Sequence, residues 1–172
     1  MLLSKQTATR DRSDPLVEST ELAYLTRAVE LAAAARAHGN HPFGAVLVTT
    51  DGRVVEAENT VVIDRDPTGH AETNLVRRAS ATLDAAALVS STLYTSTEPC
   101  AMCCGAIFWA GIGRVVYALP ETALLELVPD GSDEGLLDLP SREVFARGGR
   151  PTEVLGPIDV PGAREVHEGF WV

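Results

Sequence analysis

Glu98-Pro99-Cys100-Ala101-Met102-Cys103 is the stretch around which the rest of the chain is arranged. Because a helix tolerates proline best in its first turn, this stretch predicts a helix over residues 100–110. Residues three apart share one face of a helix, and the positive N-terminal end of a helix favours thiolates. We therefore expect Cys100 and Cys103 to bind one metal ion together.

A second stretch, further upstream, supplies an imidazole and a carboxylate. Asp66-Pro67-Thr68-Gly69 has the composition of a turn, and His70-Ala71-Glu72 follows it at the start of a helix expected over residues 70–81. One imidazole and two thiolates suit zinc, which takes nitrogen and sulfur ligands in a tetrahedron. Three protein ligands leave the fourth corner open for water, as in catalytic zinc sites.

The order His-x-Glu followed by Pro-Cys-x-x-Cys is the signature of zinc-dependent nucleobase deaminases. The chain resembles this cytidine and nucleobase deaminase superfamily, and within it the branch of bacterial guanine deaminases and related small-base deaminases. The resemblance extends from about Phe43 to Leu119. It is also carried by the stretches Pro42-Phe43-Gly44-Ala45-Val46, Ala57-Glu58-Asn59, Asp66-Pro67-Thr68, Tyr94-Thr95-Ser96 and Gly105-Ala106-Ile107-Phe108-Trp109-Ala110.

The resemblance implies a role for each residue of the two motifs. His70, Cys100 and Cys103 are expected to hold one Zn²⁺ per chain. Glu72 is expected to be the catalytic residue, which takes a proton from the attacking water and passes it to a ring nitrogen of the base. Cys104 follows Cys103 and is turned by about 100° on a helix, so we expect it to pack in the core instead of binding metal.

Further residues are implied to contact the substrate. Asn59 matches a position whose amide reads the base, Phe43 one whose ring packs on the base, and Ala71 one whose backbone contacts it. Asn59 is also explained as a turn residue at a strand end, and Phe43 as an ordinary core residue.

Two other regions offer substrate contacts. Asp133 or Glu134 lies where guanine deaminases carry an acidic residue that accepts from two adjacent donors of the purine. The aromatics expected beside it are absent, and a solvated acidic loop explains these residues equally well. Trp171 belongs to a C-terminal segment that covers the pocket in this branch, sometimes that of a partner subunit. Otherwise it belongs to a docked terminal helix.

Composition and charge limit the classes of function. With 172 residues, of which 45% are hydrophobic, the chain is expected to form a single domain over residues 19–172, preceded by a flexible polar tail over residues 1–18. Its formal net charge of −10 argues against nucleic acid as a partner, because a basic surface provides most of the affinity for phosphates.

The sequence also predicts a cytoplasmic protein. It contains no apolar run long enough to span a membrane, and Met1-Leu2-Leu3 is followed at once by polar residues, which leaves no room for a signal peptide. The three cysteines lie within five residues of one another and cannot form a disulfide framework. A reducing compartment keeps such thiolates available for metal.

The pattern of elements predicts a three-layer α/β/α sandwich of the cytidine deaminase type around a mixed five-stranded sheet. Strands alternate with helices, so the strand-helix-strand connections should be parallel and right-handed, and only the first hairpin, through Asp51-Gly52, should be antiparallel. The strands are expected at 43–48, 53–57, 93–96, 114–118 and 152–155. Besides the two motif helices, helical segments are expected at 19–37, 121–128, 141–145 and 162–169, with an acidic loop at 129–138.

We expect the protein to be a zinc-dependent hydrolase that deaminates a free nucleobase or a small amino-heterocycle. Guanine or an amino-triazine is favoured because of the acidic loop, and cytosine is compatible. The first alternative is an adenosine deaminase acting on transfer RNA, which uses the same metal site. The second is a structural zinc module, which needs a fourth protein ligand and gives Glu72 no task. The resemblance also implies a homodimer, with exchange of the C-terminal segment as one arrangement.

Overall fold

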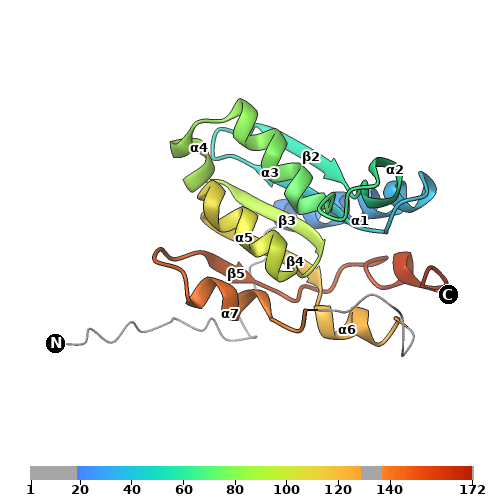
Figure 1. The fold of residues 1–172 in the computed structure, drawn as a ribbon. Helices are drawn as coiled ribbons and strands as arrows, with labels where there is room; N and C mark the ends of the chain where they lie inside the picture. Colours follow the sequence, from blue (N-terminus) through green and yellow to red (C-terminus); the bar gives the residue numbers. More distant parts are fainter. Residues whose placement is uncertain (1–18, 129–136, 172) are drawn as a thin grey trace.

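A computed structural model describes residues 19–128 and 137–171. These residues form a five-stranded mixed sheet with strand order β2-β1-β3-β4-β5 and helices on both faces (Figure 1), which confirms the predicted fold class. The elements in chain order are α1 (Ser19–Ala37), β1 (Gly44–Val48), β2 (Val54–Glu58), α2 (Val61–Asp64), α3 (Ala71–Thr82), α4 (Ala85–Val89), β3 (Thr92–Thr97), α5 (Ala101–Ala110), β4 (Arg114–Leu119), α6 (Glu121–Leu125), α7 (Ser141–Ala146), β5 (Glu153–Leu155) and the 3₁₀ turn η1 (Glu165–His167). The predicted tail over residues 1–18 lies outside the described residues, and the division into tail and domain stays a prediction.

The pairing of the strands differs from the prediction at one place. β1 and β2 form the expected antiparallel hairpin, and Gly52 in its turn has a φ of +84°, which glycine adopts without strain. β3 pairs parallel with β4, and β4 pairs parallel with β5. However, β1 also pairs antiparallel with β3, so the expectation that only the hairpin is antiparallel was wrong. β2 lies at the edge of the sheet. After β2 the chain passes through α3 and α4 and enters β3 on the other side of β1, and β3 runs in the opposite direction to β1.

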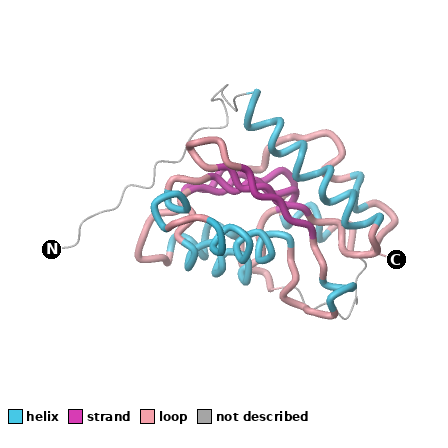
Figure 2. Tube along the Cα trace, turned by 90° about the horizontal axis from the view of Figure 1, so that it is seen from above, coloured by secondary structure: helices cyan, strands magenta, loops and turns pink. Residues whose placement is uncertain are grey.

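The helices cover both faces of the sheet. In Figure 1, α3 and α5 lie in front of the sheet and α1 lies behind it, and Figure 2 shows helices on both sides of the strands. One core cluster includes Leu75 of α3, Ile107 of α5 and Phe145 of α7, and the other includes Leu25 of α1 and Leu124 of α6. The sheet therefore separates two apolar cores, as in a three-layer sandwich.

The contact between α1 and the sheet is close. A Cβ added to Gly44 would lie 2.4 Å from the carbonyl oxygen of Ala28 and 2.6 Å from the backbone nitrogen of Ala32. Glycine at the start of β1 thus lets the helix backbone approach the strand directly.

Three short elements differ from the expectations. The short helices α2 and α4 were not predicted from the sequence. The helix predicted over residues 162–169 is replaced by the 3₁₀ turn η1. The first two backbone N–H groups of α2 after Val61, those of Val62 and Ile63, donate to Asn40 Oδ1 at 3.2 and 3.1 Å. α2 is therefore stabilised by a side chain from a distant part of the chain, a contact that local sequence does not reveal.

The residues of the site lie at one end of the strands. β2 and β3 end where β1 begins, because β1 runs antiparallel to both. α3 and α5 begin at this same end of the strands, and they pack against each other. The motifs His70-Ala71-Glu72 and Pro99-Cys100 therefore lie together although they are separated in sequence. None of the helices within the described residues is long and apolar enough to cross a membrane.

Candidate metal and active site

His70 and Cys100 both lie at the N-caps of their helices. His70 precedes α3 with φ and ψ of −66° and 153°, and Cys100 precedes α5 with φ and ψ of −64° and 169°. Both conformations are extended, so the directions of these two side chains are not set by the periodicity of the helices that follow. This explains how His70 and Glu72, two residues apart, reach the same site.

The three predicted ligands converge. His70 Nδ1 lies 3.7 Å from Cys100 Sγ and 3.6 Å from Cys103 Sγ. In a tetrahedral site with Zn–S of about 2.3 Å and Zn–N of about 2.0 Å, a nitrogen and a sulfur lie about 3.5 Å apart. The donor set and its spacing therefore fit one zinc ion, as predicted. Among the described residues this group has just these three members, which leaves the fourth corner for water or substrate.

The contact between the two thiols shifts their pKa values in opposite directions. It lowers the pKa of Cys100 to about 4 and raises the pKa of Cys103 well above its ordinary value. Burial and the nearby carboxylate of Glu72 also raise the pKa of Cys103. Zinc binding therefore has to displace the proton from Cys103, because a coordinating thiol is deprotonated.

Glu72 lies in the first turn of α3, where its side chain is buried and only 4% of the residue is exposed. Thr95 Oγ1 donates to Glu72 Oε1 at 2.8 Å, and Cys103 Sγ lies 3.4 Å from Glu72 Oε2. Burial raises the pKa of Glu72 above its ordinary value. Threonine therefore holds one carboxylate oxygen, and the other faces the ligand group.

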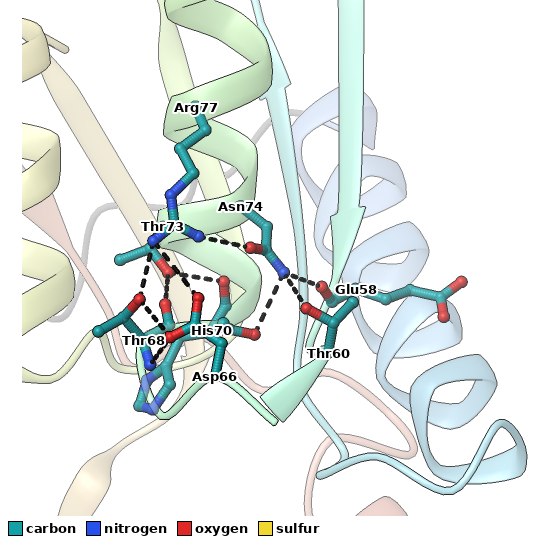
Figure 3. A network of polar contacts seen from close by, with 9 residues as sticks. Glu58, Thr60, Asp66, Thr68, His70, Thr73, Asn74 and Arg77 are labelled. Atoms are coloured by element: carbon teal, nitrogen blue, oxygen red, sulfur yellow. Dashed lines mark hydrogen bonds and ion pairs between the residues drawn. The ribbon is translucent and has the colours of Figure 1, made fainter. Parts of the chain in front are cut away.

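A network of polar contacts fixes the loop that leads to His70 (Figure 3). Asp66 Oδ1 accepts from the backbone nitrogen of Thr68 at 2.8 Å and from Thr68 Oγ1 at 2.7 Å. Thr73 Oγ1 donates to the carbonyl oxygens of Thr68 and His70. Arg77 Nη2 donates to Thr68 Oγ1 at 2.8 Å. The first two turns of α3 thus hold the turn that precedes their own N-cap.

The residues predicted to contact the substrate come from the ends of several elements. Asn59 follows β2 and is fully buried, with Oδ1 accepting from the backbone nitrogen of Val61 at 3.0 Å and Nδ2 without a hydrogen-bond partner among the described residues. The ring of Phe43 lies nearly parallel to that of His70, with an interplanar angle of 8° and centroids 6.5 Å apart. Ala71 is fully buried in the first turn of α3.

The C-terminal segment packs against the same region of its own chain. The ring of Trp171 lies 6.0 Å from Phe43 and 6.1 Å from His167, which is fully buried. His167 Nε2 lies 3.3 Å from Thr97 Oγ1, while His167 Nδ1 and Trp171 Nε1 are buried without partners in the part of the chain that the structure describes. Burial lowers the pKa of His167 to about 4, so the imidazole is neutral at pH 7. We call Phe43, Asn59, His167 and Trp171 the base side, after the substrate contacts predicted for Phe43, Asn59 and Trp171, and His70, Glu72, Cys100 and Cys103 the metal side.

Other predicted residues are placed as follows. Cys104 is fully buried in the core and its Sγ donates to the carbonyl oxygen of Pro99 at 3.3 Å, which confirms the packing role. Asp133 and Glu134 lie outside the described residues. Sequence reasoning missed Thr95 as the partner of Glu72 and missed Arg36. Arg36 Nη1 donates to the carbonyl oxygens of Val166 at 2.7 Å and Glu168 at 2.9 Å. Nothing local marks either residue, since both contacts join distant segments.

Comparisons with known proteins agree with this geometry. The family model for the cytidine and deoxycytidylate deaminase zinc-binding region matches residues 18–119. A probable cytosine deaminase of Schizosaccharomyces pombe is 40% identical over 151 residues, which cover 88% of this chain and 92% of that protein. A tRNA-specific adenosine deaminase of Haemophilus influenzae is 42% identical over 95 residues, 55% of each chain.

Among solved structures, the guanine deaminase of Nitrosomonas europaea superposes with a TM-score of 0.71 and 28% identity, covering 90% of this chain and 86% of that one. The family match includes both metal-binding motifs, and the three ligands are placed to hold one ion. The chain therefore belongs to the cytidine and deoxycytidylate deaminase family and is a zinc-dependent hydrolytic deaminase.

Proposed function

We propose that this chain deaminates a free nucleobase, with guanine or a guanine-like base as the first candidate and cytosine as the second. The observation that carries the proposal is the buried amide Nδ2 of Asn59, which has no partner among the described residues. The next residue, Thr60, donates from its backbone nitrogen to the carbonyl oxygen of Gly69, which immediately precedes the metal ligand His70. An unpaired buried donor costs about 1–3 kcal/mol unless a ligand accepts from it. A base with a carbonyl oxygen or ring nitrogen supplies such an acceptor.

The rings of Phe43 and His70 suit a flat substrate. They are nearly parallel with centroids 6.5 Å apart. Carbon atoms in contact lie about 3.5 Å apart, so two rings that enclose a third are separated by about 7 Å. A planar heterocycle between them would have its edge available to Asn59 and to the backbone of Ala71.

The chemistry requires one proton carrier beside the metal. When bound, zinc supplies a water molecule whose pKa is lowered to about 7. Glu72 Oε2 would accept a proton from the attacking water, since Oε1 already accepts from Thr95. It then passes the proton to a ring nitrogen of the base and helps the amino group leave. The C–NH₂ bond is replaced by C=O, and one water is consumed for each ammonia released.

Charge favours a free base over transfer RNA. The formal net charge of −10 repels a phosphate backbone, whose affinity for proteins depends on basic side chains. Guanine is favoured over cytosine if Asp133 or Glu134 accepts from the two adjacent donors of the purine. Cytosine stays the second candidate because a relative that matches 88% of this chain is a probable cytosine deaminase.

We further propose a cytoplasmic homodimer in which the C-terminal segment covers the pocket of its own chain. Trp109 on α5 is 84% exposed and Met102 on the same helix is partly exposed, a pair that an apolar interface would bury. The contacts of Trp171 with Phe43 support closure within one chain. Light scattering after size exclusion should give the mass of a dimer for the wild type and of a monomer for Trp109→Glu.

The experiment that tests the function measures ammonia release by purified protein with stoichiometric zinc. The substrates are guanine, cytosine, cytidine, adenosine, ammeline and an anticodon stem-loop. We expect turnover of a free base, with guanine or ammeline first. Turnover of the stem-loop alone would overturn the proposal, and so would the absence of activity on all six.

A further inference from the structure

We infer that Asn74 is a positioning residue that sets where Asn59 stands relative to the metal ligands. Asn74 lies in the second turn of α3, one turn beyond His70, and its backbone nitrogen donates to the His70 carbonyl oxygen at 2.9 Å. It belongs neither to the three metal ligands nor to the residues that face the base. Its side chain nevertheless contacts the segments that carry both groups (Figure 3).

The amide nitrogen of Asn74 lies within hydrogen-bonding distance of three acceptors, which share its two N–H groups. Nδ2 lies 3.0 Å from the carbonyl oxygen of Glu58, 2.9 Å from Thr60 Oγ1 and 3.1 Å from the carbonyl oxygen of Gly69. Glu58 and Thr60 are the two neighbours of Asn59, and Gly69 immediately precedes His70. A single amide group thus joins the segment of the base-reading residue to the segment of the zinc-binding imidazole.

The orientation of this amide is fixed from its other end. Asn74 Oδ1 accepts from Arg77 Nη1 at 3.0 Å, so the oxygen faces arginine and the NH₂ group faces the three acceptors. The two segments also meet through the Thr60 backbone nitrogen, which donates to the Gly69 carbonyl oxygen at 2.8 Å. Two adjacent hydrogen bonds to one carbonyl restrict how far the segments can move relative to each other.

This arrangement has a consequence for binding of the base. Asn59 uses Oδ1 to accept from the backbone nitrogen of Val61, which leaves Nδ2 as its free donor. The direction of that donor depends on the backbone between Glu58 and Thr60. Loss of the Asn74 amide would therefore move the donor relative to the metal and weaken binding of the base, while the ligands His70, Cys100 and Cys103 keep their places.

A double-mutant cycle tests this inference. Wild type, Asn59→Ala, Asn74→Leu and the double variant are compared by KM and kcat for the best base of the substrate panel, by zinc content and by Tm. We expect Asn74→Leu to raise KM about tenfold in the wild type but less than about twofold in Asn59→Ala, because the two residues act through one contact. Zinc should stay at one per chain.

A matched control and a second variant keep the result interpretable. Ser91→Ala removes a buried hydrogen bond of 2.7 Å to the Leu88 carbonyl oxygen, away from the site, and should lower Tm without changing KM. If Asn74→Leu does not fold, Asn74→Ala takes its place, since it removes the same amide and leaves a smaller side chain. It should raise KM in the wild type and not in Asn59→Ala.

Three results would overturn the inference: an unchanged KM, equal effects in the two backgrounds, or loss of zinc from the Asn74 variant. The inference rests on the proposed function, but the two fail in distinguishable ways. A wild type without deaminase activity defeats the proposed function. An active wild type whose two substitutions act independently defeats only the role of Asn74.

Discussion

The two sides of the site differ in how well their polar groups are satisfied. On the metal side, Glu72 accepts from Thr95, and the loop before His70 is held by several side chains of α3. On the base side, Asn59, His167 and Trp171 each bury a polar atom that has no partner among the residues the structure describes. Buried polar groups are normally paired, so unpaired ones need an explanation. This difference fits the proposal that the metal side is organised before the substrate arrives and that the base side gains its missing partners from the substrate.

The largest expected effect separates two adjacent thiols of the metal side. Cys103→Ala removes a ligand and should abolish both bound zinc and ammonia release. Cys104→Ala removes a core sulfur and should keep one zinc per chain at a cost of about 1 kcal/mol in the free energy of unfolding. Metal analysis after dialysis and urea unfolding give the two quantities. Loss of zinc from the Cys104 variant would contradict the assignment.

The second prediction concerns the proton carrier. Glu72→Gln keeps an oxygen for Thr95 to donate to but cannot carry a proton, so kcat should fall about 100- to 10,000-fold. Zinc content should equal that of the wild type. Steady-state kinetics on the best base of the panel gives the measurement. A variant that binds zinc and deaminates at the wild-type rate would show that Glu72 is not the acid and base.

The third prediction tests whether the base side depends on the C-terminal segment. Arg36→Ala removes the two hydrogen bonds to Val166 and Glu168 and the contact of the guanidinium with the ring of Phe170. KM should rise about tenfold with zinc content unchanged, because the segment that carries Trp171 is less well held. Arg27→Ala is the matched control on the same helix, since Arg27 binds Glu30 and Glu56 instead. Equal KM values for the two variants would show that the C-terminal segment does not contribute to binding of the base.

The smallest effect concerns stability as a function of pH. The pKa of His167 is lowered from 6.5 to about 4 by burial, so between these values the unfolded chain binds a proton that the folded chain does not. This contribution to stability is complete above pH 6.5 and is lost as the pH falls towards 4, by about 3 kcal/mol at most. Urea unfolding from pH 7.5 to 4.5 should show a weaker dependence for His167→Gln than for wild type.

Much of the fold was predictable because its signals are local. Ser19 and the His38-Gly39-Asn40 stretch bound α1, with Gly39 at a φ of +88° beyond the helix end. Asp51-Gly52 marked the hairpin. The ligands were predictable for the same reason, since Cys100 and Cys103 lie three residues apart and His70 follows a turn.

What the sequence did not reveal depends on distant contacts. The antiparallel pairing of β1 with β3 follows from the path through α3 and α4, and α2 is held by Asn40 from another segment. On the base side, the ring of Phe43 lies close to that of Trp171, which comes from the opposite end of the sequence. No spacing rule links residues so far apart, so Trp171 could be proposed only by resemblance, and Arg36 and Asn74 could not be proposed at all.

Removal and return of zinc tests the central claim most directly. Protein treated with a chelator, dialysed and titrated with Zn²⁺ should regain ammonia release from a free base in proportion to bound metal, with saturation at one zinc per chain. Cys103→Ala titrated in parallel should stay inactive. Full activity of the metal-free wild type, or an activity that does not follow the zinc content, would contradict a catalytic zinc held by His70, Cys100 and Cys103.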